Sequence, residues 1–145
     1  MKIFMCGICG HLAFNDIPEK CPVCGAEKKE FTQNDKIFED SQAKSPEADV
    51  KHVPFVQVNK ECRLIPEKAC TDILVRIGST LHPMEEKHFI RFTDCYLDHT
   101  YIGRAFLTPG LNPAACFHLK SKGKTVTVVE NCTIHGYWMA DKAIA

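Results

Sequence analysis

Short apolar runs separated by turn residues dominate the chain from about residue 51 onward. Four of these runs are rich in β-branched and aromatic side chains, namely residues 53–58, 73–77, 89–92 and 125–129. A further strand is predicted near 115–120, joined to 125–129 by a hairpin turn at Ser121-Lys122-Gly123-Lys124. No long segment has the 3.6-residue period of a helix. About seven short strands over this part predict an all-β sandwich.

The N-terminal residues have a different pattern, built on two Cys-x-x-Cys-Gly knuckles. Each knuckle places two sulfurs on one side of a tight turn, and glycine relieves the backbone where it bends. Four thiolates can then form a tetrahedron that suits Zn²⁺ or a single iron ion. The four predicted ligands are Cys6, Cys9, Cys21 and Cys24. His11 lies beside a knuckle, and we expect it at the surface because four cysteines already complete the site.

These patterns divide the chain into three parts. Residues 1–31 are predicted to be a four-cysteine metal module, which the metal has to stabilise because so short a segment cannot bury an adequate core. Residues 32–50 are polar and acidic, with Ile37 and Phe38 as the main large apolar side chains, and are predicted to be a linker. Residues 51–145 are predicted to be the β-sandwich domain.

Composition and charge narrow the function classes. Eighteen basic and eighteen acidic residues leave a net charge of zero, so no basic field predicts nucleic-acid binding. No apolar stretch approaches about 18 residues, and the cysteine motif follows Met1 too closely for a signal peptide. We therefore expect no membrane association and a cytoplasmic location. An odd count of nine cysteines with two Cys-x-x-Cys pairs favours reduced, metal-bound thiolates over disulfides.

A second group of candidate metal ligands lies in the predicted sandwich. His82 and His88 are six residues apart with a proline between them, a spacing that suits a turn wrapping a central object. Cys132 and His135 can offer a thiolate and a ring nitrogen to one point. If these two loops converge, the result is an N/S metal site, and His52 would complete a set of five ligands.

Three motifs together resemble the superoxide reductases, also called desulfoferrodoxins or neelaredoxins. They occur in family order, roughly within residues 48–138, and read Lys51-His52-Val53-Pro54, His82-Pro83-Met84-Glu85-Glu86-Lys87-His88-Phe89-Ile90 and Cys132-Thr133-Ile134-His135-Gly136-Tyr137-Trp138. The N-terminal module resembles the shortened rubredoxin domains of rubrerythrins, which implies a one-electron centre with one iron bound by four cysteines. The alternative for this module is a structural zinc ribbon.

The resemblance implies an immunoglobulin-like sandwich with one iron bound by His52, His82, His88 and His135 in a plane and by Cys132 on the axis. The open sixth position would accept superoxide, which is reduced to hydrogen peroxide without oxygen release. Lys51 is the predicted catalytic residue, because a cation beside the open position raises the local anion concentration and assists proton delivery. The implied partners are superoxide, an electron donor such as a rubredoxin or a reductase, and further copies of the chain in a dimer or tetramer.

One position departs from the family pattern. The loop that typically reads Glu-Lys-His in the family reads Val50-Lys51-His52 here. In the family this glutamate is understood to ligate the oxidised iron, and Asp49 is one position away and points elsewhere in an extended segment. We therefore expect the oxidised iron of this chain to lack a carboxylate ligand.

The remaining histidines and cysteines are expected to have structural roles. His99 and His118 are predicted to be hydrogen-bonded structural residues, and four cysteines without ligand-like spacing are predicted to be small buried side chains: Cys62, Cys70, Cys95 and Cys116. Two other functions stay open at this point. One is an electron carrier whose second iron is closed to ligands, and the other is a non-catalytic sandwich with structural zinc.

Overall fold

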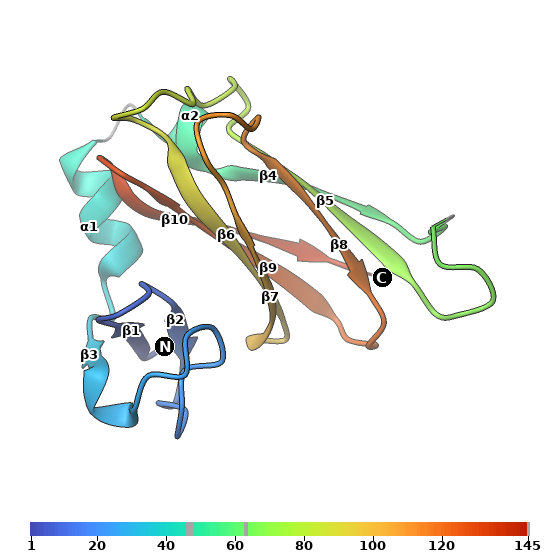
Figure 1. Ribbon diagram of the computed structural model, residues 1–145, viewed down its shortest axis with the longest axis horizontal. Helices are drawn as coiled ribbons and strands as arrows, with labels where there is room; N and C mark the ends of the chain where they lie inside the picture. Colours follow the sequence, from blue (N-terminus) through green and yellow to red (C-terminus); the bar gives the residue numbers. More distant parts are fainter. Residues whose placement is uncertain (46–47, 63, 145) are drawn as a thin grey trace.

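Two antiparallel sheets pack face to face in the C-terminal part of the chain (Figure 1). The computed structural model describes residues 1–45, 48–62 and 64–144. One sheet has the strand order β10-β9-β6-β7 and the other has the order β4-β5-β8. The strands are β4 Pro54–Asn59, β5 Thr71–Ile77, β6 Ile90–Leu97, β7 Thr100–Phe106, β8 Ala114–Leu119, β9 Thr125–Cys132 and β10 Gly136–Ala143. The predicted all-β, immunoglobulin-like sandwich is confirmed.

The core between the sheets follows from the two-residue period of the strands. Ile73, Val75 and Ile77 alternate along β5 and are buried, whereas the residues between them face outward. They pack against apolar side chains of the opposite sheet, including Val126 and Val128 of β9. This apolar contact between the inner faces fixes the positions of the strand ends that carry the candidate ligands.

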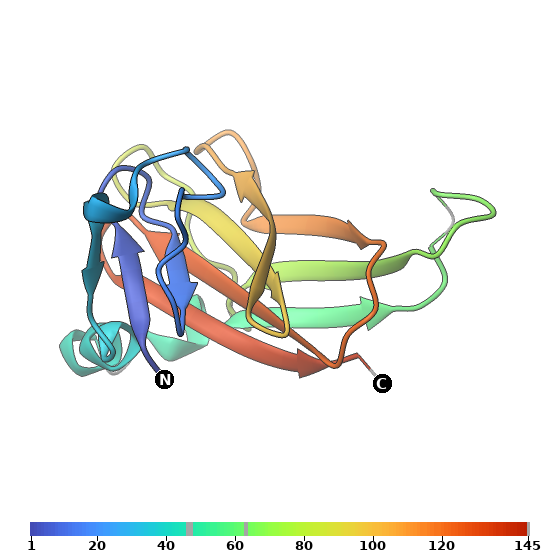
Figure 2. The same ribbon diagram turned by 90° about the horizontal axis from the view of Figure 1, so that it is seen from below.

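The outer face of the four-stranded sheet is covered by the N-terminal module, which Figure 2 shows beside it. The module contains β1 Ile3–Cys6, β2 Leu12–Phe14, the 3₁₀ helix Lys28–Glu30 and β3 Phe31–Gln33. Leu12 and Phe14 pack against Phe92 and Tyr137 of the sheet. Strands β6 and β9 are therefore buried on both faces, and their sequences do not alternate between apolar and polar residues.

Two short helices lie in and beside the predicted linker. Helix α1 Ile37–Lys44 runs beside β10, and Ile37 is buried in the cluster between the module and the sheet (Figure 1). Helix α2 Asp49–His52 follows and ends at the first candidate ligand. Residues 46 and 47 of the predicted linker lie outside the described part. No helix among the described residues is long and apolar enough to cross a membrane.

The predicted hairpin between residues 115–120 and 125–129 is wrong. Strand β8 pairs with β5, whereas β9 pairs with β6 and β10, so the turn between them connects the two sheets. The backbone N–H groups of Lys124 and Thr125 donate to the Asp98 carboxylate at the β6–β7 turn, at 3.1 and 3.0 Å. A Gly-containing turn signal does not distinguish a hairpin from a crossover, because both need the same local backbone.

Candidate metal centre

Four imidazole rings surround a common point at one end of the sandwich, and each ring has two of the others as neighbours. Going around it from His52 through His82, His88 and His135, the centroids of neighbouring rings lie 4.5, 4.8, 5.0 and 4.9 Å apart. The His52 and His88 centroids, which face each other across the arrangement, are 6.5 Å apart. Neighbouring rings are inclined by 64° to 80°. All four rings therefore surround one point.

Three segments that are distant in the sequence bring these side chains together. His52 is the last residue of α2, His82 and His88 lie on the β5–β6 loop, and Cys132 ends β9. The β5–β6 loop is joined to the β9–β10 turn by a hydrogen bond from Thr133 N to Phe89 O of 3.0 Å. The two motifs therefore converge as the sequence predicted.

The thiol of Cys132 lies close to the same point. Its Sγ atom is 3.5 Å from Nε2 of His82 and 3.8 Å from Nδ1 of His135. The donor atoms of His52, His82, His88 and Cys132 all lie within 4.8 Å of one another. His135 joins this set through its contacts with Cys132 and with the neighbouring rings, so all five predicted residues are assembled. We call these five side chains the five-ligand centre.

The surroundings of the ring nitrogens indicate which nitrogen each of three histidines can offer to a metal. Nδ1 of His82 is 2.6 Å from the carbonyl oxygen of Pro83, which requires Nδ1–H as donor and leaves a lone pair on Nε2. Nδ1 of His52 faces the Glu130 carboxyl group at 3.6 Å, so Nε2 of His52 is left for the centre. Nε2 of His88 is buried without a hydrogen-bond partner among the described residues, as expected for a nitrogen that binds a metal.

Burial keeps the rings in the form that binds metals. It lowers the pKa of His52 to about 3, with the neighbouring imidazoles as further causes. It also lowers the pKa of His82 to about 4, against which the hydrogen bond to Pro83 acts. Burial raises the pKa of the Cys132 thiol, so a metal ion has to displace the thiol proton when it binds. The rings of His52 and His82 are therefore neutral at pH 7.

Two buried side chains behind the ring of histidines support His52 and His135. The Trp138 indole stacks on His52 with a centroid distance of 5.0 Å, and its Nε1–H donates to the His135 carbonyl oxygen at 3.0 Å. Glu130 is fully buried, and both of its carboxyl oxygens lack a hydrogen-bond partner among the described residues. The nearest basic group is Nδ1 of His52, which makes Glu130 the carboxyl group that can orient this ring.

One side of the centre is open, and Cys132 is not among the residues that line it. A cavity of about 540 Å³ lies there, and three of the four imidazoles form part of its wall. Its lining residues are Lys44, Ser45, Ala48, Lys51, His52, His88 and His135. Lys51 is exposed at the cavity, on the turn of α2 that ends in His52. The described lining contains two lysines and no carboxylate.

The residues at the position of the family's glutamate face away from this cavity. Asp49 accepts a hydrogen bond from the Val50 backbone N–H at 2.9 Å, and both residues line a separate hollow with Phe55 and Ser79. Helix α2 is a single turn, so the geometry differs from the extended segment expected from the sequence. The expectation that Asp49 points elsewhere agrees with this arrangement.

The N-terminal knuckles also assemble their four sulfurs. Sγ of Cys6 is 3.7 Å from Sγ of Cys24, and Sγ of Cys9 is 3.5 Å from Sγ of Cys21. Tetrahedral binding with metal–sulfur bonds of about 2.3 Å places neighbouring sulfurs about 3.8 Å apart. Each knuckle closes with a hydrogen bond of 2.9 Å from its glycine N–H to the carbonyl oxygen of its first cysteine. The geometry fits a single tetrahedral ion.

A buried polar network fastens the first knuckle to the sandwich. Arg104 pairs with Asp94 and donates to the Cys9 carbonyl oxygen at 2.9 Å. The His11 ring lies 3.1 Å from the Asp94 carboxylate and is 2 % exposed, so the prediction that His11 is a surface residue is wrong. The sequence did not reveal this role, because Asp94 and Arg104 meet His11 only after β6 and β7 pair.

The other predicted structural residues have mixed outcomes. Cys95 is buried as expected, but Cys116 is exposed, and Cys62 and Cys70 are half-buried beside His118. His118 is hydrogen-bonded to Asp72 at 2.8 Å, as predicted. His99 is exposed and its ring makes no hydrogen bond within the described residues, so the prediction that it is a hydrogen-bonded structural residue is wrong. Glu130 and Trp138 are the functional candidates that sequence reasoning did not single out.

Comparison with known proteins assigns the chain to a family. The family model for desulfoferrodoxin matches residues 43–141, which is more than half of the chain. The chain belongs to the desulfoferrodoxin family. A second model, the rubredoxin-like domain of rubrerythrin, matches residues 4–32. This desulfoferrodoxin therefore carries a rubrerythrin-type rubredoxin domain at its N-terminal end.

Individual relatives cover the chain to different extents. A desulfoferrodoxin from Desulfarculus baarsii is 28% identical over 143 residues, which are 97% of this chain and 96% of that protein. One from Syntrophotalea carbinolica is 37% identical over 94 residues, and the match spans 63% of this chain and 62% of that relative. The structure of a superoxide reductase from Nanoarchaeum equitans superposes with a TM-score of 0.53 and 26% identity, covering 64% of this chain and 92% of that one.

Proposed function

We propose that this desulfoferrodoxin is a superoxide reductase. Its reaction adds one electron and two protons to superoxide and forms hydrogen peroxide. The observation that carries the proposal is that four imidazoles and a thiol surround one point, while three of the imidazoles, but not the thiol, line an open cavity with two lysines. A closed structural site has no such open side.

The donor set fits a mononuclear iron. The buried Nε2 of His88 has no hydrogen-bond partner in the described part of the chain. The hydrogen bond from Nδ1 of His82 to Pro83 leaves a lone pair on Nε2 of His82 for a metal. Four neutral imidazoles with one thiolate suit iron, because a soft thiolate donates electron density strongly. Cys132, His52, His82, His88 and His135 would hold the iron. The iron, when bound, supplies the electron that superoxide takes up.

The residues around the cavity attract and orient the substrate. Lys51 and Lys44 place two positive charges at the entrance, which raises the local concentration of a small anion. The ammonium group of Lys51 can also hold a water molecule near the bound anion and pass protons to it. Trp138 stacks on the His52 ring and the Glu130 carboxyl group faces its Nδ1 at 3.6 Å, so both limit the movement of this ring.

We further propose that the four-cysteine module holds iron and delivers electrons to the centre. All four donors are sulfur, and the module matches a rubredoxin-like domain. A connected route leads from this module to the centre, because Gly10 follows Cys9 and its carbonyl oxygen accepts a hydrogen bond of 2.6 Å from Tyr137, two residues after His135. The donor that reduces the module is predicted to be a separate rubredoxin or reductase.

The test is rapid mixing of the fully reduced protein with a pulse of superoxide. We expect one hydrogen peroxide for each superoxide consumed and no oxygen release, whereas a dismutase releases oxygen. The variant Cys132→Ser should lose this reaction, and Cys116→Ser should keep it because Cys116 is an exposed thiol on β8. Oxygen release by the wild-type protein, or full activity of Cys132→Ser, would contradict the proposal.

Azide binding separates the proposed activity from that of an electron carrier with a closed second iron. Only a centre with an open position changes its absorption spectrum when a small anion binds. We expect azide to change the spectrum of the oxidised centre and to leave the spectrum of the four-cysteine module unchanged, because four cysteines already fill a tetrahedral site.

A further inference from the structure

A third group of metal-binding side chains lies on the outer face of the three-stranded sheet. It contains two thiols, one imidazole and one carboxylate, whose donor atoms all lie within 4.8 Å of one another. We call this group the outer cluster: Cys62, Cys70, Asp72 and His118. It shares no residue with the five-ligand centre or the four-cysteine module, so neither of those sites explains it.

The pairing of β5 and β8 brings three members of the outer cluster together. Asp72 of β5 is directly opposite His118 of β8 in the strand register. Cys70 precedes Asp72 by two residues, and the two-residue period of a strand places it toward the same outward face. The contact between Asp72 and His118 is not visible as a sequence motif, because the two residues are 46 positions apart.

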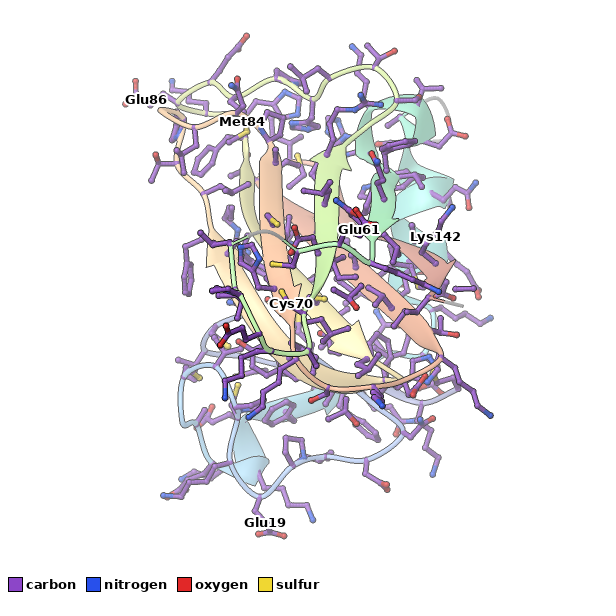
Figure 3. The ribbon with its side chains drawn as sticks, turned by 90° about the vertical axis from the view of Figure 1, so that its right-hand side faces the viewer. Glu19, Glu61, Cys70, Met84, Glu86 and Lys142 are labelled. Atoms are coloured by element: carbon purple, nitrogen blue, oxygen red, sulfur yellow. The ribbon has the colours of Figure 1, made fainter. Side chains whose placement is uncertain are left out.

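The fourth member comes from the loop between β4 and β5. This loop projects from the end of the sandwich in Figures 1 and 2, and Figure 3 shows Cys70 and Glu61 on the side facing the viewer. Cys62 lies on the loop just after β4 and points back to the sheet, where its Sγ is 3.5 Å from Nδ1 of His118. The loop therefore closes onto the sheet through side chains that bind metals.

The separations between the donor atoms are those of a tetrahedral site. The distance from Sγ of Cys70 is 3.6 Å to Oδ1 of Asp72 and 4.0 Å to Nδ1 of His118. Zinc bonds of about 2.3 Å to sulfur and about 2.0 Å to nitrogen place neighbouring S and N donors about 3.5 Å apart. Nδ1 of His118 is 2.8 Å from Oδ1 of Asp72, a hydrogen-bond distance that has to lengthen slightly around an ion.

We propose that the outer cluster binds a zinc ion that fastens the β4–β5 loop to the sheet. Two thiolates, one imidazole and one carboxylate are ligands that zinc accepts in tetrahedral sites. Four protein donors complete the coordination, so the ion has a structural role and no open position. A disulfide between Cys62 and Cys70 needs neither the imidazole nor the carboxylate, whereas zinc uses all four side chains.

The zinc site is independent of the proposed superoxide chemistry. His52 lies two residues before the start of β4, whereas Cys62 follows the end of β4 and Cys70 precedes the start of β5, at the other end of these two strands. The seven residues of β5 span roughly 20 Å at about 3.3 Å per residue. Loss of the outer ion is therefore expected to leave superoxide reduction unchanged, so the two proposals succeed or fail separately.

Metal counting on the purified full-length protein tests the proposal. The chain is expressed with zinc in the medium, desalted, and measured by elemental analysis for iron plus zinc per chain. We expect three ions in the wild-type protein and two in Cys62→Ser/Cys70→Ser and in His118→Ala. Cys116→Ser is the matched control, because Cys116 is an exposed cysteine on β8 outside the outer cluster, and it should keep three ions.

X-ray absorption at the zinc edge gives an independent measurement on the wild-type protein, whether or not the variants fold. Zinc in the outer cluster has two sulfur and two lighter ligands, whereas zinc in the four-cysteine module has four sulfurs. A mixed ligand shell supports the proposal. Two metal ions per wild-type chain, a purely sulfur shell, or a mass about two daltons lower from a Cys62–Cys70 disulfide would overturn it.

Discussion

The Tyr137 hydroxyl donates a hydrogen bond of 2.6 Å to the carbonyl oxygen of Gly10. This bond joins a segment of the five-ligand centre to the first knuckle of the four-cysteine module. Tyr137 follows His135 by two residues, and Gly10 follows Cys9 directly. Gly10 has a φ of +79°, and a Cβ atom there would lie 2.8 Å from the Tyr137 hydroxyl. Glycine is therefore required both by the knuckle and by the close approach of the tyrosine.

Replacing Tyr137 by phenylalanine should weaken the connection between the module and the centre. The Gly10 carbonyl oxygen loses its partner in a half-buried position, so the free energy of unfolding should fall by about 1–2 kcal/mol. Electron transfer from the reduced four-cysteine module to the oxidised centre, followed by stopped-flow absorption, should become slower. Tyr101→Phe is the control, because the Tyr101 hydroxyl makes no hydrogen bond within the described residues. Equal transfer rates in both variants would argue against the route.

Lys51 is predicted to attract superoxide to the centre. Lys51→Met should reduce the second-order rate constant for superoxide roughly tenfold at low ionic strength and weaken its dependence on salt, because a positive charge at the cavity is lost. Lys51→Arg should retain most of the rate. Lys142→Met removes an exposed charge from the far end of β10 and should leave the rate unchanged (Figure 3). An unchanged salt dependence in Lys51→Met would leave this lysine without the predicted role.

The cysteine and histidine spacings predicted the two main sites because these motifs are local. A knuckle or a Cys-x-x-His turn encodes its own geometry, and short β-branched runs mark strands whatever their partners. The site residues His82 and Cys132 could therefore be assigned before the strand pairing was known. The wrong hairpin at residues 121–124 shows the limit, since strand partners depend on which faces become buried.

The remaining parts of the sites depend on pairing across the fold. Glu130 is one of eight residues in β9 and becomes a neighbour of His52 only in the folded chain. His11 is buried because β6 and β7 present Asp94 and Arg104 to it. The four-sided arrangement of imidazoles likewise requires the β5–β6 loop and the β9–β10 turn to be joined. The pattern of residues along the sequence does not indicate any of these contacts, because each joins residues that are distant in the chain.

Glu130 is predicted to position the His52 ring. Glu130→Ala removes the carboxyl group that faces Nδ1 of His52, so iron affinity of the five-ligand centre should fall about 10- to 100-fold. Glu130→Gln keeps an oxygen that can accept a hydrogen bond from Nδ1–H and should retain most of the affinity. Chelator competition measures the difference, and the visible spectrum of the four-cysteine module serves as an internal reference. Identical affinities in the two variants would show that the carboxyl group does not orient the ring.

Asp49 is predicted to stay away from the oxidised iron. Its carboxylate accepts the Val50 N–H and lines a hollow separate from the cavity of the centre. Asp49→Ala should therefore leave the absorption spectrum of the oxidised protein unchanged, and azide should bind the wild-type protein and the variant equally well. A carboxylate-bound ferric spectrum that disappears in Asp49→Ala would mean that the α2 turn rearranges on oxidation.

The metal-free protein is predicted to lose stability as the pH falls from about 6.5 toward 4. Burial lowers the pKa of His52 to about 3 and that of His82 to about 4, whereas both rings in the unfolded chain take up protons near pH 6.5. The unfolded state therefore binds more protons in this window, and the free energy of unfolding decreases as the pH is lowered. Each ring contributes a slope of up to about 1.4 kcal/mol per pH unit.

Above about pH 7.5 these two rings are almost wholly neutral in both states, so their contribution is complete and independent of pH. Urea unfolding of the metal-free protein at several pH values measures the slope. Replacing His52 by glutamine should reduce the slope, because one of the two buried rings is then absent. His99→Gln is the matched control, since His99 lies at the β6–β7 turn and is exposed. A stability that is flat from pH 7 to pH 4.5 would show that the two imidazoles are protonated in the folded metal-free protein.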